Sequence, residues 1–257
     1  MSKIIAVTNQ KGGVGKTTTA VSVAYFLAKK NFRVLLVDFD PQGNATSSLG
    51  IDKNRLKLTI LDALDGTTTL KNAIVKTEFK KIYIAPSTPK LADAEPGLAK
   101  LTIHERFVQL RQILQPACKS YDYVIIDSPP SLSLLTVNAL VAADFVLLPV
   151  QAEYFAMEGL TQLLNTIKLI RSNGLNPTLE ILGVLMTMVA KNTLARQVVE
   201  QVQRHFPGKV FKTVIPRNVR LAEAPSFGMP IGVYDKLSKG SRAYKALTAE
   251  IIERITE

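Results

Sequence analysis

The stretch Lys11-Gly12-Gly13-Val14-Gly15-Lys16-Thr17-Thr18 decides the fold. A short apolar run at residues 4–7 precedes it, and apolar residues at helical spacing follow it over residues 17–30. A strand, a glycine-rich loop and a helix in this order are typical of a phosphate site. Glycine lets backbone N–H groups turn toward phosphate oxygens, and the helix N-terminus adds a positive dipole. The sequence therefore predicts a nucleotide-binding loop.

The polar side chains of this loop have expected roles. We expect Lys16 to bridge the β- and γ-phosphates of ATP and Thr17 to ligate Mg²⁺. The strict loop pattern begins with a glycine, whereas this chain has Gln10 there, followed by the extra basic residue Lys11. The residues expected to bind the nucleotide are Lys11, Gly12, Gly13, Val14, Gly15, Lys16, Thr17 and Thr18.

Two further apolar runs end in carboxylates. Asp127 closes the run at residues 123–126, and Asp38 and Asp40 follow the run at residues 34–37. Ligands of doubly wound sheets bind at the carboxyl ends of the strands. We therefore expect Asp38 and Asp127, with Thr17, to form the metal site, and Asp40 to orient the attacking water. The alternative is that Asp127 caps a turn and that Asp40 only begins one.

The wider pattern predicts an α/β fold with a doubly wound, mostly parallel sheet and helices on both faces. Apolar runs without polar alternation read as strands that are buried on both sides, and helical stretches lie between them. Strands are expected at residues 4–7, 34–37, 82–85, 123–126, 145–150 and 181–188, and helices at 17–30, 103–114, 157–171, 194–206 and 241–255. No repeat or Pro/Gly-rich linker divides the chain, so residues 1–257 are expected to form a single domain.

Composition narrows the function classes. The 257 residues are 47% hydrophobic and 21% charged, as in a globular protein. A single cysteine, Cys118, excludes an internal disulfide or a cysteine-built metal centre within one chain. With no leader and no apolar stretch of about 18 residues, a cytoplasmic protein is expected. The net charge of +11, denser in the C-terminal third, favours an anionic partner, either nucleic acid or an acidic membrane, over a merely soluble basic surface.

At the phosphate loop and at the strands that end in carboxylates, the chain resembles the deviant Walker A ATPases, and most closely the ParA/Soj family of chromosome- and plasmid-partition ATPases. The resemblance covers nearly the whole chain, and it implies the P-loop NTPase fold. The stretches that carry it include residues 9–18, residues 38–44, Asp127-Ser128-Pro129-Pro130-Ser131 and Ile215-Pro216-Arg217-Asn218.

The resemblance also implies a mechanism. ATP binding would bring two subunits face to face, with Lys11 reaching the phosphates of the other subunit, Lys16 binding phosphate within its own subunit and Asp40 positioning the water. Pro216 and Asn218 would lie against the adenine. The ATP-bound homodimer would bind DNA without sequence preference and associate with the nucleoid, and a ParB-like partner would stimulate hydrolysis.

Four basic residues are expected to contact DNA: Lys191, Arg196, Arg217 and Arg220. Phosphate contacts need only positive charge spread over one surface. Close relatives carry an Asp-x-Arg-Thr segment where this chain reads Val189-Ala190-Lys191-Asn192-Thr193, so Lys191 or Arg196 is expected to replace that arginine. The alternative is that each of the four is an ordinary solvated charge.

Other function classes fit less well. A MinD-like membrane-cycling ATPase is the main alternative, but the helix expected at 241–255 has acidic as well as basic residues opposite its apolar stripe, so no membrane contact is expected. An electron carrier with a bridging cluster needs two cysteines per subunit, and a metabolic P-loop enzyme would not need Lys11. Because the loop begins at residue 11, no preceding operator-reading domain is expected.

Overall fold

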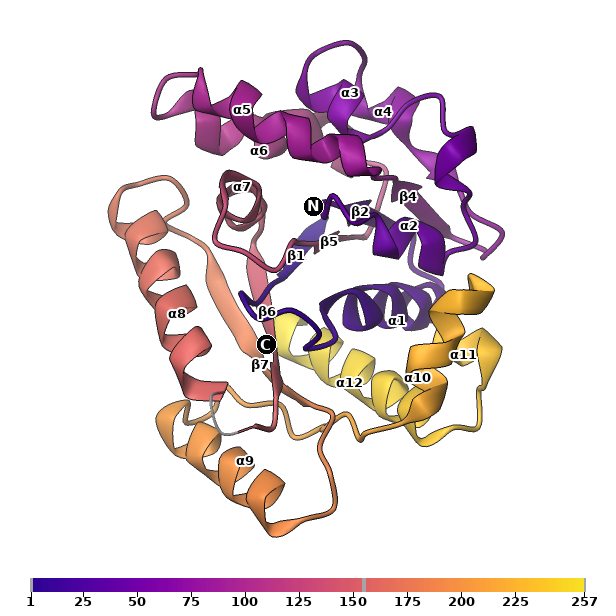
Figure 1. Cartoon of the computed structure of the whole chain (residues 1–257), viewed down its shortest axis with the longest axis vertical. Helices are drawn as coiled ribbons and strands as arrows, with labels where there is room; N and C mark the ends of the chain where they lie inside the picture. Colours follow the sequence, from indigo (N-terminus) through magenta and orange to yellow (C-terminus); the bar gives the residue numbers. More distant parts are fainter. Residues whose placement is uncertain (1, 154–155, 257) are drawn as a thin grey trace.

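The computed structural model describes residues 2–153 and 156–256. Its centre is a seven-stranded sheet in the order β3-β4-β2-β5-β1-β6-β7 (Figure 1). The strands are β1 (Lys3–Val7), β2 (Val34–Asp38), β3 (Val75–Lys76), β4 (Ile82–Ala85), β5 (Tyr123–Asp127), β6 (Phe145–Gln151) and β7 (Glu180–Thr187). β3 is antiparallel to β4, and the other pairs are parallel. The predicted mostly parallel sheet and its six predicted strands are confirmed.

Helices cover both faces of the sheet (Figure 1). The five predicted helices are confirmed as α1 (Lys16–Lys29), α6 (Glu105–Cys118), α8 (Ala156–Ser172), α9 (Thr193–His205) and α12 (Lys239–Thr256). The sequence did not predict α7 (Leu134–Ala142) or the short helices α2 (Asn44–Ser48), α3 (Ile60–Leu64), α4 (Leu70–Ala73), α5 (Ala94–Ala99), α10 (Val219–Glu223) and α11 (Ile231–Tyr234). Short 3₁₀ helices lie at Lys53–Arg55, Pro89–Asp93 and Ala224–Phe227.

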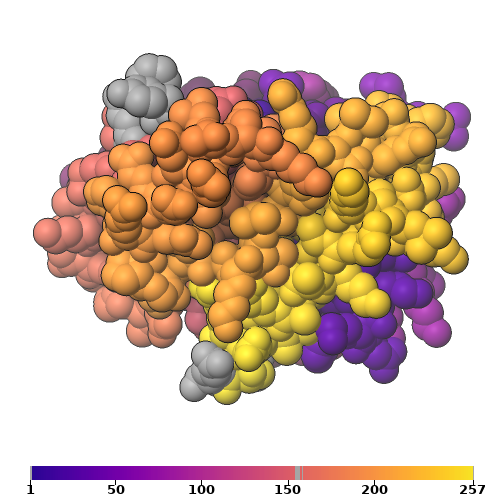
Figure 2. All heavy atoms as spheres, turned by 90° about the horizontal axis from the view of Figure 1, so that it is seen from below, coloured from indigo at the N-terminus to yellow at the C-terminus, as the bar shows by residue number. Residues whose placement is uncertain are grey.

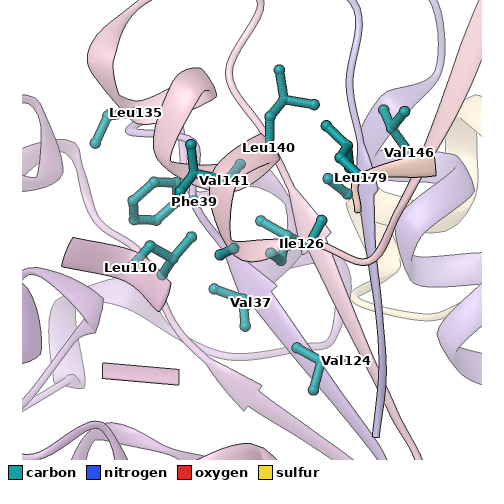
Figure 3. Packing of buried hydrophobic residues seen from close by; sticks show 14 of the residues in the cluster. Val37, Phe39, Leu110, Val124, Ile126, Leu135, Leu140, Val141, Val146 and Leu179 are labelled. Carbon is teal, nitrogen blue, oxygen red and sulfur yellow. The ribbon is translucent and has the colours of Figure 1, made fainter. Parts of the chain in front are cut away.

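Alternate strand residues enter two apolar cores on opposite faces of the sheet. In β2, Leu35 and Val37 belong to one core, and Val34 and Leu36 belong to the other. The first core includes residues of α6, α7 and α8, and Figure 3 shows Phe39 among the side chains that gather around its strands. The second core includes residues of α1 and α12. Burial on both faces explains why the strands read as unbroken apolar runs.

The sheet brings the predicted site residues to one edge. β5 lies between β1 and β2, with Val7 and Asp38 each in register with Asp127. The phosphate loop leaves the end of β1 and enters α1, which packs beside α12 (Figure 1). The C-terminal third of the chain forms most of the face shown in Figure 2.

α12 packs as the sequence predicted. Its apolar stripe includes Leu247 and Ile251, which are fully buried against the second core. Within residues 2–153 and 156–256, no helix has the length and apolar character needed to cross a bilayer.

Candidate nucleotide site

A cavity of about 620 Å³ opens at the carboxyl edge of the sheet. One side is the phosphate loop, and the other side is the segment between β7 and α10. The residues that line it include Gly12, Gly13, Gly15, Lys16, Thr17, Thr18, Asp40, Pro130, Thr187, Pro216, Arg217, Asn218, Leu221 and Tyr244. The structure therefore brings most of the predicted phosphate-loop residues, Asp40, Pro216 and Asn218 to one cavity.

The loop has the backbone of an anion cradle. Gly15 precedes α1 with φ of 89°, a left-handed conformation that L side chains rarely adopt, and nothing lies within 4 Å of where its Cβ would stand. From β7, the Thr187 hydroxyl donates to the Val14 carbonyl oxygen at 2.9 Å. The loop is thus held from the far side while its inner face stays open to phosphate oxygens.

Lys16 is a buried cation beside two carboxylates. Lys16 is only 6% exposed, and its Nζ donates to the Lys11 carbonyl oxygen at 3.1 Å. Burial lowers the pKa of Lys16, whereas the carboxylates of Asp127 and Asp40 oppose that shift. A lysine in this position is suited to phosphate, because a bound anion stabilises the protonated form that burial disfavours.

Asp38 and Asp127 lie opposite each other in the ladder between β2 and β5, and both are fully buried. Asp38 Oδ2 accepts from the Thr46 N–H and hydroxyl, each at 2.7 Å. Neither carboxylate oxygen of Asp127 has a hydrogen-bond partner among the residues that the structure describes. Burial raises the pKa of Asp38 to about 6. Burial and the Asp38 carboxylate raise the pKa of Asp127 well above its usual value.

A buried carboxylate without a partner is costly unless a cation compensates it. Asp127 therefore fits the predicted metal site, and its pKa is also influenced by the nearby Thr17 hydroxyl and Lys16 ammonium. Across the described ranges, no group of three or more His, Cys, Asp or Glu side chains could hold a metal ion by itself. One buried carboxylate with a nearby hydroxyl suits Mg²⁺, which keeps several waters and binds one or two carboxylates together with substrate phosphates.

Asp40 sits at a tight turn that borders the cavity. Its Oδ1 accepts from the Gln42 N–H at 2.9 Å, and its main-chain oxygen accepts from the Gly43 N–H at 2.9 Å. Asp40 is 6% exposed and lines the cavity with Lys16 and Thr17. Asp40 does begin a turn, as the alternative interpretation of the sequence predicted. That turn also places its carboxylate at the nucleotide cavity.

Lys11 is placed differently from Lys16. Its Nζ forms an ion pair with Glu153 Oε2 at 2.5 Å, and its side chain is 45% exposed. Its main-chain N–H donates to Asn9 Oδ1 at 3.0 Å, and Asn9 in turn donates to the Pro149 carbonyl oxygen at 2.7 Å. The backbone of Lys11 is therefore fixed, while its ammonium group lies at the surface.

The cavity has an apolar end opposite the phosphate loop. Pro216, Leu221 and Tyr244 line it, and the Tyr244 hydroxyl is 3.0 Å from the Thr19 hydroxyl inside the core. Asn218 Oδ1 accepts from the Arg220 N–H at 2.9 Å at the start of α10, so its amide is held in place. An apolar wall with a fixed amide suits a purine base.

The four predicted DNA contacts do not form one cluster. Lys191 and Arg196 line a separate surface cavity of about 660 Å³ between the end of β7 and α9. Arg217 is exposed but lines the nucleotide cavity. Arg220 forms ion pairs with Glu223 at 2.9 Å and Asp235 at 3.6 Å. The structure brings together only Lys191 and Arg196, and their role in DNA binding remains a prediction.

Sequence reasoning missed several residues that shape this site. Thr187 ends β7, Ser87 stands two residues beyond β4, and Glu153 stands two residues beyond β6. Each follows a buried strand at the carboxyl edge of a parallel sheet. The rule that identified Asp38 and Asp127 would have marked these three as well.

The chain is similar to known proteins over most or all of its length. A family described as "AAA domain" matches residues 2–181. The chain is 51% identical over 252 residues to the sporulation initiation inhibitor protein Soj of Bacillus subtilis (strain 168), with 98% of each chain covered. It is 49% identical over 257 residues to the chromosome partitioning protein ParA of Myxococcus xanthus (strain DK1622), with 100% of this chain and 90% of the relative covered.

A solved structure shares the whole architecture. The crystal structure of cobyrinic acid a,c-diamide synthase from Mycobacterium smegmatis with bound ADP and magnesium matches with a TM-score of 0.87 and 35% identity, over 100% of this chain and 96% of that chain. Its name describes another activity, and this chain is more similar in sequence to the two partition proteins.

The glycine-rich loop after β1, its two lysines and the buried carboxylates define a class of protein, the P-loop ATPases with a deviant Walker A loop. Within that class, the chain belongs to the ParA/Soj family of chromosome-partition ATPases. The predicted family, fold class and ATPase activity are confirmed.

Proposed function

We propose that this ATPase is a nucleotide-timed DNA-partition switch, in which ATP with Mg²⁺ assembles a homodimer and hydrolysis resets it. The observation that carries the proposal is the placement of the two loop lysines. Lys16 is buried beside Asp127 at the cavity, whereas the Lys11 ammonium is half exposed at the surface. A cation that a second subunit must supply would stand outside its own cavity, as Lys11 does.

The residues at the cavity divide the chemistry among them. Lys16 and the loop N–H groups would bind the triphosphate, and Thr17 with Asp127 would hold the metal, with Asp38 beside them. Mg²⁺ would neutralise charge on the β- and γ-phosphates. Asp40 would orient the attacking water toward the γ-phosphate, and Lys11 of the other subunit would stabilise the charge that develops there.

DNA and a ParB-like partner complete the proposed cycle. The net charge of +11 and the exposed pair Lys191 and Arg196 support binding to an anionic polymer without sequence preference. A ParB-like, DNA-bound protein would then stimulate hydrolysis, and the subunits would separate. Such a cycle ties DNA affinity to the presence of the γ-phosphate.

The test is the ATPase rate of the purified protein alone, with DNA, with a candidate ParB-like protein, and with both. We expect a low basal rate that rises strongly only when both are present. A rate that is high without either addition, or unaffected by both together, would contradict the proposal.

A MinD-like membrane cycle is the second candidate, and the structure disfavours it at α12. Leu247 and Ile251 lie in the core, so the stripe that would have to enter a bilayer already packs against α1 and the sheet. Binding to anionic vesicles in the presence of ATP would be the contrary result. That residues 1–257 form a single domain remains a prediction.

A further inference from the structure

A closed set of buried hydrogen bonds joins the end of β2 to the segment after β4, outside the phosphate loop. The Thr46 hydroxyl donates to Asp38 Oδ2 at 2.7 Å and accepts from the Ser87 N–H at 3.0 Å. The Ser87 hydroxyl donates to the main-chain oxygen of Asp40 at 2.8 Å. Thr46 and Ser87 are fully buried, so water does not compete for these bonds.

The same set fixes the turn that carries Asp40. The main-chain oxygen of Asp40 receives the Ser87 hydroxyl from one side and the Gly43 N–H from within the turn. Asp38 and Asp40 are separated by one residue, and each is bonded to one member of the Thr46–Ser87 pair. The path Asp38 to Thr46 to Ser87 to Asp40 therefore closes on itself through the main chain.

Packing at Gly43 removes the remaining freedom of the turn. Gly43 has φ of 62°, and a Cβ there would lie 2.8 Å from the Ser87 carbonyl oxygen. Lys53 closes the outer side, where its Nζ donates to the Gln42 carbonyl oxygen at 2.8 Å. The turn and the Ser87 segment are thus in contact through both hydrogen bonds and backbone atoms, and one cannot shift without the other.

We propose that Thr46 and Ser87 are positioning residues for hydrolysis, which hold the Asp40 turn so that its carboxylate stays directed at the nucleotide cavity. The inference rests on the proposed role of Asp40. A group that orients water acts only from a narrow range of positions, so a small shift of the turn slows hydrolysis. ATP binding uses the loop and Lys16 instead, so we expect it to change little when the Asp40 turn shifts.

The experiment compares matched variants. Thr46→Val keeps the shape of the side chain and loses the hydroxyl, Thr46→Ser keeps the hydroxyl, and Ser87→Ala removes the contact to Asp40. Ser48→Ala is the control, because Ser48 is a buried hydroxyl of the same short helix whose bond goes to the Asn44 carbonyl oxygen at 2.7 Å. ATP affinity, melting temperature and the single-turnover hydrolysis rate are measured for each variant.

We expect Thr46→Val and Ser87→Ala to slow single-turnover hydrolysis on the order of 10- to 100-fold, with ATP affinity within about twofold of the parent. Thr46→Ser and Ser48→Ala should hydrolyse at nearly the parent rate. Ser87→Ala should add little to Asp40→Ala, because residues that act through one group are not additive.

Two results separate the inference from the proposed function. If Asp40→Ala itself hydrolyses ATP at the parent rate, the assigned role of Asp40 is wrong and the inference falls with it. If Asp40→Ala is inactive while Thr46→Val and Ser87→Ala turn over normally, only the positioning role is wrong. A loss of ATP affinity and melting temperature without slower turnover of bound ATP would also overturn it, since that is the signature of a structural role.

Discussion

The ammonium of Lys11 is held 2.5 Å from Oε2 of Glu153, across 142 residues of sequence. Gln151 donates to the other Glu153 oxygen at 2.6 Å, so the carboxylate is held from the β6 side as well. In the single subunit, the lysine that we assign to a neighbouring active site is therefore paired within its own chain. It must leave Glu153 before it can reach the phosphate of a second subunit.

Glu153→Gln should therefore favour ATP-dependent dimerisation. Both side chains of the pair are about half exposed, at 45% and 50%, and such pairs contribute only about 0.2–1 kcal/mol. Each dimer would break two such pairs, so their removal should tighten the dimer about 2- to 30-fold by analytical ultracentrifugation with ATP. Glu200→Gln is the matched control, because Glu200 is also 50% exposed and pairs at 4.0 Å with Arg204 on α9. An unchanged or weaker dimer would show that Glu153 does not restrain Lys11.

Lys16→Ala should lose ATP-dependent dimerisation. Lys16 is buried at the cavity beside the carboxylates of Asp127 and Asp40, where its charge would meet the bound phosphates. Hydrolysis should fall by about 100-fold or more. Lys29→Ala, at the exposed far end of the same helix, is the control and should behave as the parent. A dimer of Lys16→Ala that persists with ATP on a sizing column would contradict the assigned role.

Asp40→Ala should retain ATP and accumulate as a dimer. The substitution removes the group that we expect to orient water, but leaves the loop, Lys16 and Asp127 in place. Loss of such a group slows hydrolysis on the order of 100-fold or more. The measurement is the fraction of ATP still intact in the isolated dimer after the parent has turned over. Turnover at the parent rate would refute the water-orienting role.

The nucleotide-free protein should become more stable as the pH falls from about 7.5 to 5.5. The pKa of Asp38 is raised to about 6 by burial, and that of Asp127 is raised by burial and by Asp38. An acid whose folded pKa exceeds its unfolded value of about 3.9 stabilises the fold fully below that unfolded value, and this contribution is lost as the pH rises through the folded pKa. Melting temperatures across this range measure the effect.

Asp127→Asn is the variant that isolates this effect. It removes one of the two titrating carboxylates, so the melting temperature should depend less on pH than in the parent. The nucleotide-free variant should also melt higher at neutral pH, because it no longer buries a second carboxylate beside that of Asp38. A pH profile parallel to that of the parent would show that Asp127 does not titrate in this range.

The strands could be predicted from the sequence because each is marked by its own run of apolar residues. The runs at residues 34–37 of β2 and 123–126 of β5 lack polar alternation since both faces are buried, and that signal needs no knowledge of the rest of the chain. α7 escaped because seven of its nine residues are buried, which leaves no polar stripe to give a helical period. The helices of four to six residues are too short for a period to be read.

The same distinction separates the site residues that could be predicted from those that could not. The phosphate loop, Asp38 and Asp127 could be predicted because each is marked by its own neighbours in sequence. The Thr46–Ser87 contact joins residues 41 apart, and the Lys11–Glu153 pair joins residues 142 apart. Those contacts follow from which strands become neighbours in the sheet, and a single sequence does not carry that information.

DNA binding should require ATP and weaken steeply with salt, with Lys191 and Arg196 contributing to the slope. The two side chains are exposed around one surface cavity at the start of α9. Each phosphate contact contributes about 0.9 to the slope of log affinity against log salt. The double variant Lys191→Ala, Arg196→Ala should therefore bind more weakly and reduce the slope by about 2 in fluorescence anisotropy on duplexes of unrelated sequence.

Lys80→Ala is the control for this prediction. Lys80 is an exposed lysine two residues before β4, at the amino edge of the sheet and so at the opposite end of the strands from the nucleotide cavity. Its removal changes the net charge without touching α9, and the salt slope should stay within about 0.3 of the parent. Equal losses in the control and the double variant would mean that DNA responds to total charge alone. A slope unchanged in both would mean that DNA contacts other residues. Arg217, which lines the nucleotide cavity, would then be the next residue to test.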